Sequence, residues 1–270
     1  MSNGQDYPLG YSDREAQRLK DQSARVEELT EDVFRRAGLR PGMRVLDLGS
    51  GAGDVALLAA RMVGADGAVL GVEKSAASVE NARRRIAELG ARNVTFEQAD
   101  LAVFETDTKF DAIVGRFVLS YLPDRANIIR KLTRCLKPSG IIALLEIDML
   151  QIAETPPSAL FTKARQWMLD AFAATGAELD MGAKLYATFL QAGLSAPNMI
   201  AAHPVVGGPE VRAYDDLVQG LRSLMPFIER NGVSAADIDV DTLAERLRND
   251  AIANQRVVFM SRIVGAWTRV

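Results

Sequence analysis

Apolar residues follow one spacing at the start of the chain and a different one after Gly42. From Ser12 to about Leu39 the sequence is rich in helix formers, and Ser12 with Glu15 forms a capping-box pattern at its start. Apolar residues then recur at helical spacing, so one face of this stretch can be buried. They are Val26, Leu29, Val33 and Phe34.

After Gly42 the pattern changes to short runs that are rich in β-branched residues. Helical patterns separate these runs, and such alternation predicts parallel βαβ units with helices on both faces of a sheet. The expected strands are MRVLDLG, AVLGVE, VTFEQAD, FDAIVGR and GIIALLEID, and the expected helices span about 54–62, 75–89 and 124–136.

The C-terminal third predicts a smaller set of elements. Helices are expected over 158–175 and 183–190, and strands over 198–206 and 256–270, with a polar, helix-rich stretch between the two strands. A segment inserted after a parallel strand emerges at the carboxyl edge, where ligands bind. We therefore expect a single α/β domain with an N-terminal helical cap (1–42), a Rossmann-like core (43–206 and 255–270) and an inserted helical lid (207–254).

Composition excludes some classes of protein. Lys and Arg total 32 against 35 Asp and Glu, a balance that does not favour a nucleic-acid partner. One cysteine, Cys135, excludes a disulfide within the chain and a zinc site made of several thiolates. The apolar runs are too short to cross a bilayer and no signal peptide is evident, so a cytoplasmic protein without membrane contacts is expected.

The segment VLDLGSGAGD predicts a ligand-binding turn. An apolar strand leads into Gly49, Gly51 and Gly53, and glycines let the backbone turn tightly and approach a ligand. A dinucleotide fingerprint would place its third glycine at position 54, which is Asp54 here. The carboxylate of Asp47 suits a ligand that carries an ammonium group and would repel a pyrophosphate. This pattern favours S-adenosylmethionine over NAD or ATP.

Two further acids follow predicted strands at the same edge of the sheet. Glu73 can accept hydrogen bonds from both hydroxyls of a ribose, and Asp100 from an adenine amino group. The order Asp47, Glu73, Asp100 along the chain is the order that an adenosyl ligand would need. Each acid taken alone would more often be a solvated carboxylate or a helix cap.

Residues Met43 to Asp148 resemble the class I (Rossmann-like) methyltransferase family, bacterial small-molecule type. VLDLGSGAGD resembles its first motif, FDAIVGRFVLSYLPD its fourth, and LKPSGIIALLEID its fifth strand. The opening YPLGYSDREAQRL is similar to the start of some bacterial small-molecule methyltransferases. The resemblance implies a doubly wound seven-stranded, mostly parallel sheet with an antiparallel last strand, and a cofactor site for S-adenosylmethionine, whose product is S-adenosylhomocysteine. The implied cofactor residues are Asp47, Gly49, Ser50, Gly51, Gly53, Glu73, Lys74, Asp100, Leu101 and Arg116.

The sequence indicates the residues that would contact the methyl acceptor less strongly than those that would bind the cofactor. His203, the only histidine, and Asp148, which ends the fifth strand, are candidate catalytic bases for a hydroxyl acceptor. A histidine bonded to nearby backbone and a strand-end acid are the plain alternatives. Aromatic residues that could contact the substrate are Tyr7, Tyr11, Tyr121 and Trp167, although core packing is the commoner role of such residues. No metal cluster is expected.

The function indicated is methyl transfer to a small organic acceptor, with oxygen as the favoured atom. A methyltransferase acting on protein or RNA, a non-catalytic S-adenosylmethionine-binding regulator and a nicotinamide oxidoreductase are the alternatives. The spacing at Asp54 argues against the last of these. The sequence leaves a homodimer open.

Overall fold

The computed structural model describes residues 26–209, 211–230 and 238–270. Contacts divide the chain into two compact units. Among the described residues, the core unit comprises 26–146, Gly182–Ala201 and Val264–Val270, and the helical unit comprises Ile147–Met181 and the described part of 202–263. The helical unit is larger than the insertion expected at 207–254.

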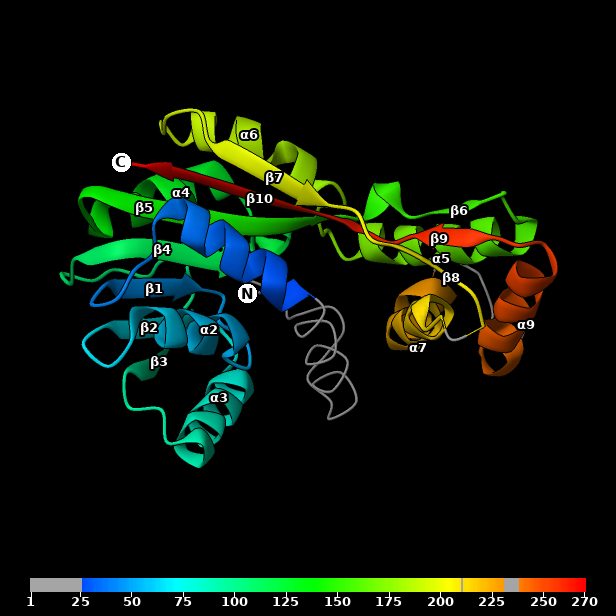
Figure 1. Ribbon diagram of the computed structural model, residues 1–270, viewed down its shortest axis with the longest axis horizontal. Coiled ribbons are helices and arrows are strands. Elements are labelled where there is room, and N and C mark those ends of the chain that lie inside the picture. Colours follow the sequence, from blue (N-terminus) through cyan, green and yellow to red (C-terminus); the bar gives the residue numbers. More distant parts are fainter. Residues whose placement is uncertain (1–25, 210, 231–237) are drawn as a thin grey trace. The chain divides into compact units, whose positions relative to one another are not determined.

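A seven-stranded sheet with the order β3-β2-β1-β4-β5-β10-β7 forms the centre of the fold (Figure 1). Strands β1 to β5 pair in parallel, and β10 is antiparallel, so the predicted doubly wound sheet is confirmed. The strands are β1 (Arg44–Leu48), β2 (Ala68–Glu73), β3 (Val94–Gln98), β4 (Phe110–Arg116), β5 (Leu136–Asp148), β7 (Asn198–Ala202) and β10 (Arg262–Arg269).

Helices cover both faces of this sheet. Residues 26–37 are helical, and the helices α2 (Asp54–Val63), α3 (Ala76–Leu89), α4 (Arg125–Leu132) and α6 (Met181–Gln191) follow, with a short 3-10 turn η1 (Leu119–Tyr121) and a second, η2 (Thr133–Cys135). A Cβ on Gly265 would meet Val33 of helix 26–37, whereas a Cβ on Gly182 of α6 would meet Val264. Because Val264 and Gly265 are successive strand residues, these two helices lie on opposite faces.

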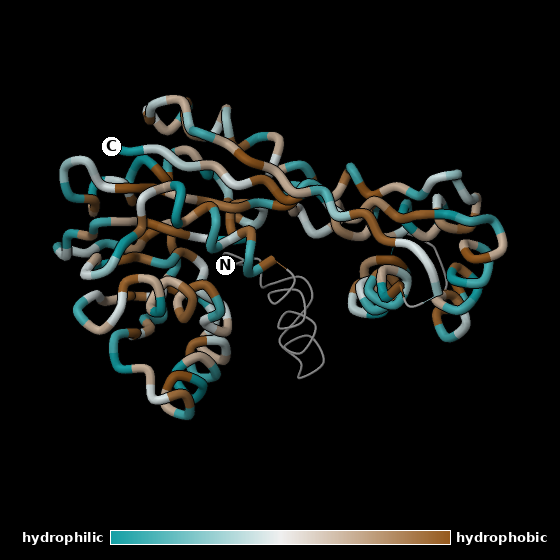
Figure 2. The backbone as a smooth tube through the Cα atoms, viewed as in Figure 1, coloured by the Kyte–Doolittle hydropathy of each residue, from teal (hydrophilic) through white to brown (hydrophobic). Residues whose placement is uncertain are grey.

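Hydrophobic burial explains why the central strands form. The last four residues of β1 and most of β4 and β5 are buried, and Figure 2 shows hydrophobic residues along these strands. Near-continuous apolar runs are expected for parallel strands that are covered on both faces. Asp47 in β1 and Glu146 in β5 are fully buried exceptions to this apolar pattern.

The helical unit has its own sheet and its own hydrophobic core. Its three short strands lie in the order β6-β9-β8, and both pairs are antiparallel. Buried residues from its helices and from β9 form one cluster, which includes Phe161, Tyr214 and Leu247. The elements are η3 (Met149–Gln151), β6 (Ala153–Thr155), α5 (Ala159–Ala174), β8 (Val205–Gly207), α7 (Ala213–Arg230), α9 (Val240–Ala253) and β9 (Val257–Phe259).

Two of the expected strands are divided in the structure, so the prediction of continuous strands over 198–206 and 256–270 is wrong. The first breaks at His203 and Pro204, because proline lacks the N–H that a strand ladder needs. The second breaks after Phe259, where the Met260 amide donates to the carbonyl of Pro204 instead of to a strand partner (2.9 Å). In both cases the two halves join different sheets.

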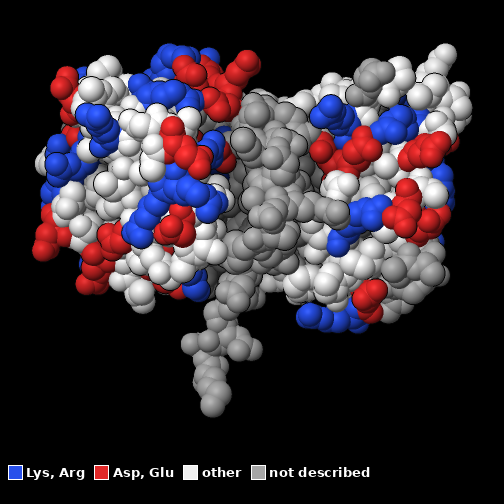
Figure 3. Space-filling model, turned by 90° about the horizontal axis from the view of Figure 1, so that it is seen from below, with Lys and Arg blue, Asp and Glu red and all other residues white. Residues whose placement is uncertain are grey.

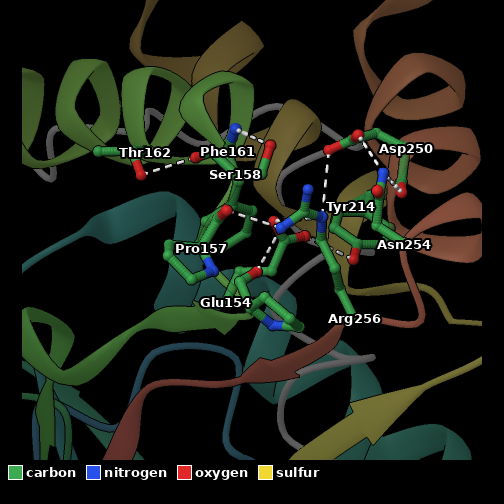
Figure 4. Close-up of polar contacts among 10 residues, drawn as sticks. Glu154, Pro157, Ser158, Phe161, Thr162, Tyr214, Asp250, Asn254 and Arg256 are labelled. Atoms are coloured by element: carbon green, nitrogen blue, oxygen red, sulfur yellow. Dashed lines mark hydrogen bonds and ion pairs between the residues drawn. The ribbon is translucent and has the colours of Figure 1, made fainter.

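A buried polar network joins the strands and helices of the helical unit (Figure 4). The Tyr214 hydroxyl donates to Glu154 Oε1 (2.9 Å), and Arg256 Nη1 donates to the carbonyls of Pro156 and Pro157 (2.6 Å each). Arg256 Nε also lies 3.4 Å from Asp250 Oδ2. Burial raises the pKa of Glu154, and the Tyr214 hydrogen bond opposes this shift. The network therefore links β6, α7 and the end of α9.

Candidate active site

The glycine turn follows β1 at the carboxyl edge of the core sheet. Gly49, Gly51 and Gly53 all have positive φ angles (59°, 51° and 87°), a conformation that side chains with a Cβ rarely adopt. A Cβ on Gly49 would lie 2.5 Å from Val118 Cγ2, whereas no atom of the described residues lies within 4 Å of the same position on Gly51. The backbone at Gly51 is therefore open to close approach by a ligand.

Asp47 is the most unusual residue beside this turn. Its side chain is fully buried, and neither carboxylate oxygen has a hydrogen-bond partner within the described part of the chain. Burial raises the pKa of Asp47 well above its usual range, while the charge of Arg116 and, more weakly, the backbone N–H of Ala56, which does not reach hydrogen-bond geometry, lower it. A buried carboxylate without donors is costly unless a ligand supplies them. The Ser50 hydroxyl, also buried, lacks a hydrogen-bond partner among the same residues.

Arg116 places a positive charge close to Asp47. It ends β4, and its Nη1 donates to the hydroxyl of Thr30 in helix 26–37 (2.9 Å), which itself donates to the carbonyl of Val26 (2.7 Å). Burial lowers the pKa of Arg116, and the negative charges of Asp54 and Asp47 oppose that shift. Helix 26–37 thus orients the guanidinium of Arg116, whose charge acts on the carboxylate of Asp47.

Glu73 fixes the shape of the turn from the end of β2. Its Oε2 accepts from the amide of Gly51 (3.0 Å), and its Oε1 accepts from the amide of Ser75 (2.8 Å). Each carboxylate oxygen has two lone-pair directions, so both oxygens keep the capacity to accept from a ribose hydroxyl. The predicted ribose residue is thus also a structural part of the glycine turn.

Asp100 and Lys74 form an ion pair at the next strand end. Lys74 Nζ lies 3.0 Å from Asp100 Oδ2, while Asp100 Oδ1 accepts from the amide of Ala102 (3.0 Å). That amide hydrogen bond and the bond from Lys74 lower the pKa of Asp100, although partial burial opposes them. Leu101 is buried directly after it. The predicted cofactor residues all belong to the core unit and lie at or directly after the ends of β1, β2, β3 and β4.

The two predicted catalytic residues belong to the helical unit. Asp148 is buried, and its Oδ2 accepts a hydrogen bond from Arg262, while its Oδ1 has no hydrogen-bond partner among the described residues. His203 is exposed between β7 and β8, and its ring centroid lies 5.5 Å from that of Phe259. Both residues therefore belong to a different unit from the glycine turn.

The predicted substrate residues lie in different parts of the chain. Tyr121 ends η1 in the core unit, and its amide donates to the carbonyl of Val118 (3.2 Å). Trp167 packs against the hydrophobic cluster of the helical unit, with Lys163 Nζ 4.9 Å from its ring centroid. Tyr7 and Tyr11 lie outside the described residues.

Sequence reasoning missed the role of Glu146. Its Oε1 accepts from the amides of Val118 (2.9 Å) and Leu119 (2.7 Å), and its Oε2 accepts from the Ser120 hydroxyl (3.2 Å). Burial raises the pKa of Glu146 to about 7, against the opposing effect of these hydrogen bonds. The available signal was an acid inside the apolar run IIALLEID.

The described residues contain neither a candidate metal cluster nor a helix suited to crossing a membrane. Within the described ranges no cluster of three or more His, Cys, Asp or Glu side chains could hold a metal ion, and no helix there has both the length and the apolarity to cross a bilayer. On the face shown in Figure 3, basic and acidic side chains are interspersed over the described surface.

Comparison with known proteins identifies a family for the chain. A family described as a methyltransferase domain matches residues 39–193. The 2-phytyl-1,4-naphtoquinone methyltransferase of Synechococcus elongatus is 33% identical over 159 residues, covering 58% of this chain and 65% of that protein. The arsenite methyltransferase of Halobacterium salinarum is 34% identical over 121 residues, covering 44% and 30%. The chain thus spans less than two thirds of the length of these curated relatives.

Solved structures show the same fold. YcgJ from Bacillus subtilis has a TM-score of 0.55 at 20% identity, covering 90% of this chain and 99% of that one. YjhP from Escherichia coli has a TM-score of 0.55 at 24% identity, covering 90% and 93%. These likenesses extend over both units of the chain.

Proposed function

The chain belongs to the methyltransferase-domain family, and from that premise we propose that it transfers the methyl group of S-adenosylmethionine to a small organic acceptor. The observation that carries this proposal is the buried carboxylate of Asp47, which accepts no hydrogen bond from the described residues and feels the positive charge of Arg116. An α-amino acid carries an ammonium and a carboxylate on one carbon. Asp47 and Arg116 offer the complementary pair of charges, so they fit the methionine end of the cofactor.

The remaining residues of the site fit the rest of the cofactor. The open backbone at Gly51 allows close approach, Glu73 keeps lone pairs for the ribose, and Asp100 with Leu101 would contact the adenine. When bound, the cofactor supplies an electrophilic methyl group on a sulfonium. The protein's part is to bind both reactants in line, which removes much of the entropy cost of their meeting. An enclosed site also favours the loss of the sulfonium charge in the transition state.

A small acceptor is supported by the relatives and by the charge distribution. The names of the similar proteins include arsenite, 2-phytyl-1,4-naphtoquinone and trans-aconitate methyltransferases. Mixed charge on the described surface in Figure 3 favours neither an RNA backbone nor a strongly charged protein partner. We further propose oxygen as the methylated atom, with His203 as the general base and the free Oδ1 of Asp148 as a group that orients the acceptor.

Calorimetric titration with S-adenosylhomocysteine tests the cofactor assignment. We expect micromolar binding by the wild type, and a Kd at least about tenfold higher in Asp47→Asn, because the ammonium loses its charged partner. Asp111→Asn is the matched control. That aspartate starts β4 at the opposite edge and pairs with Lys137 (2.8 Å), so its variant should bind like the wild type. Unchanged affinity in Asp47→Asn would refute the assignment.

Activity assays test the acceptor side. The purified protein is incubated with labelled S-adenosylmethionine and separate pools of hydroxylated metabolites, amines, protein and RNA. Label transferred to a hydroxylated metabolite supports the proposal, and label on protein or RNA contradicts it. Cofactor binding without any transfer would favour the regulator instead. If His203 is the base, His203→Asn should lower kcat by about 100-fold or more without changing the Kd for S-adenosylhomocysteine, and a wild-type kcat would exclude that role.

A further inference from the structure

Glu146 makes an unusual set of contacts for a residue near the end of a buried strand. Its carboxylate is fully buried and accepts hydrogen bonds from three consecutive residues, Val118, Leu119 and Ser120. All four residues belong to the core unit. The three donors come from the loop after the neighbouring strand, β4, so the side chain ties that loop to β5.

The loop that Glu146 holds has a conformation that needs support. It begins at Phe117, a non-glycine residue with a φ of 59°, and the Phe117 amide donates to the carbonyl of Leu145 (2.9 Å). A left-handed residue of this kind persists only where its surroundings fix it. The loop leaves β4 directly after Arg116, a residue of the proposed cofactor site, and ends at Tyr121, which the sequence predicts to contact the substrate.

The same loop determines the space beside the glycine turn. The side chain of Val118 packs so closely against Gly49 that a Cβ there would lie 2.5 Å from its Cγ2 and 3.1 Å from its Cβ. Any shift of Val118 therefore changes the wall against which the turn is packed. Glu146 fixes the amide of Val118 itself, so there is a direct path from Glu146 through Val118 to Gly49.

We propose that Glu146 is a positioning residue for the cofactor site: it sets the loop 117–121 against the glycine turn without itself touching the cofactor. This inference rests on the proposed function only for the identity of the ligand. The carboxylate suits the task because two oxygens can serve three donors that lie close together. A side chain without acceptors would leave two buried amides unsatisfied and release the loop.

Three variants separate positioning from general stability. Glu146→Leu removes every acceptor, and Glu146→Gln retains one carbonyl oxygen for the two amides while its amide group can donate to the Ser120 hydroxyl. Val118→Ala leaves the hydrogen bonds in place but removes the Cγ2 methyl group, which makes the nearest contact with Gly49. Glu154→Gln is the matched control, since Glu154 is also a buried glutamate bonded to a hydroxyl but lies in the helical unit.

The first readout is the Kd for S-adenosylhomocysteine, measured by calorimetry on full-length protein. We expect a rise of about tenfold or more in Glu146→Leu and a smaller rise in Val118→Ala. Glu146→Gln should stay within about threefold of the wild type, and Glu154→Gln should not change. Wild-type affinity in Glu146→Leu would overturn the proposal. If Glu146→Leu does not fold, the Kd of Val118→Ala is the test. Wild-type affinity in Val118→Ala would then overturn the proposal.

The second readout needs no ligand. Amide hydrogen exchange in the unliganded protein should speed up at Val118 and Leu119 in Glu146→Leu, while the amides of β1 keep their wild-type protection. Unchanged protection at the two loop amides would refute the positioning role even if the proposed cofactor is wrong. Failure of the wild type to bind S-adenosylhomocysteine would refute the proposed function alone.

Discussion

The buried carboxylate of Glu146 makes the stability of the protein depend on pH in a predictable direction. Burial raises its pKa from an ordinary value of 4.5 to about 7. Between pH 4.5 and about pH 7, Glu146 is protonated in the native state, whereas in the unfolded state it has lost its proton. The free energy of unfolding should therefore fall as the pH rises. The stabilisation that comes from the protonated Glu146 is complete below about pH 4.5 and is lost above about pH 7.

The size of this effect follows from the same two values. At about 1.4 kcal/mol for each pH unit, the change in pKa from 4.5 to about 7 corresponds to about 3 kcal/mol. Glu146→Gln removes the ionisation and retains the shape of the side chain. The free energy of unfolding of the wild type, minus that of Glu146→Gln, should thus decrease by about 3 kcal/mol between pH 4.5 and pH 8.

Urea denaturation of both proteins at several pH values measures this difference. Carbon NMR of glutamate carboxyl groups, with Glu146→Gln identifying the resonance, gives the pKa directly. A difference in stability that does not change with pH would refute the reasoning, as would a Glu146 resonance that titrates near 4.5. A difference that grows with pH would mean that the hydrogen bonds from the loop outweigh the cost of burial.

Three further predictions concern the same structure. Asp47→Asn should raise the Tm of the unliganded protein because it removes a buried carboxylate whose oxygens accept no hydrogen bond from the described residues, and a lower Tm in differential scanning calorimetry would contradict this. Gly49→Ala should cost at least about 2 kcal/mol more than Gly51→Ala by urea denaturation, since both have positive φ but only Gly49 faces Val118; equal costs would contradict the packing argument. Tyr214→Phe should destabilise the protein by about 1–2 kcal/mol because it removes the hydroxyl that donates to buried Glu154, and no change in urea denaturation would show the bond to be dispensable.

The core sheet could be predicted from the sequence because its signals are local. Strands β1 to β5 are apolar runs separated by helical patterns, and the fold of such units is strongly constrained. The three-stranded sheet of the helical unit could not be predicted in the same way. Its strands are three residues long, and each pairs with a strand that is distant in sequence.

The candidate site could be predicted in part for the same reason. Spacing alone indicated Asp47, Glu73 and Asp100, since carboxyl ends of parallel strands share one edge. The spacing gave no indication that the carboxylate of Asp47 accepts no hydrogen bond from the described residues. It also did not indicate that Thr30 orients Arg116, because both features depend on how helix 26–37 packs against the sheet. Glu146 was missed because its donors lie about 27 residues earlier, in a loop whose path the pattern does not reveal.

The most direct test of the central claim is calorimetric titration of the wild-type protein with S-adenosylhomocysteine, with NADH as the control ligand. We expect one site per chain, a Kd in the micromolar range, which corresponds to about 8 kcal/mol, and no binding of NADH. Binding of NADH, or no binding of S-adenosylhomocysteine, would mean that the glycine turn and Asp47 serve another ligand.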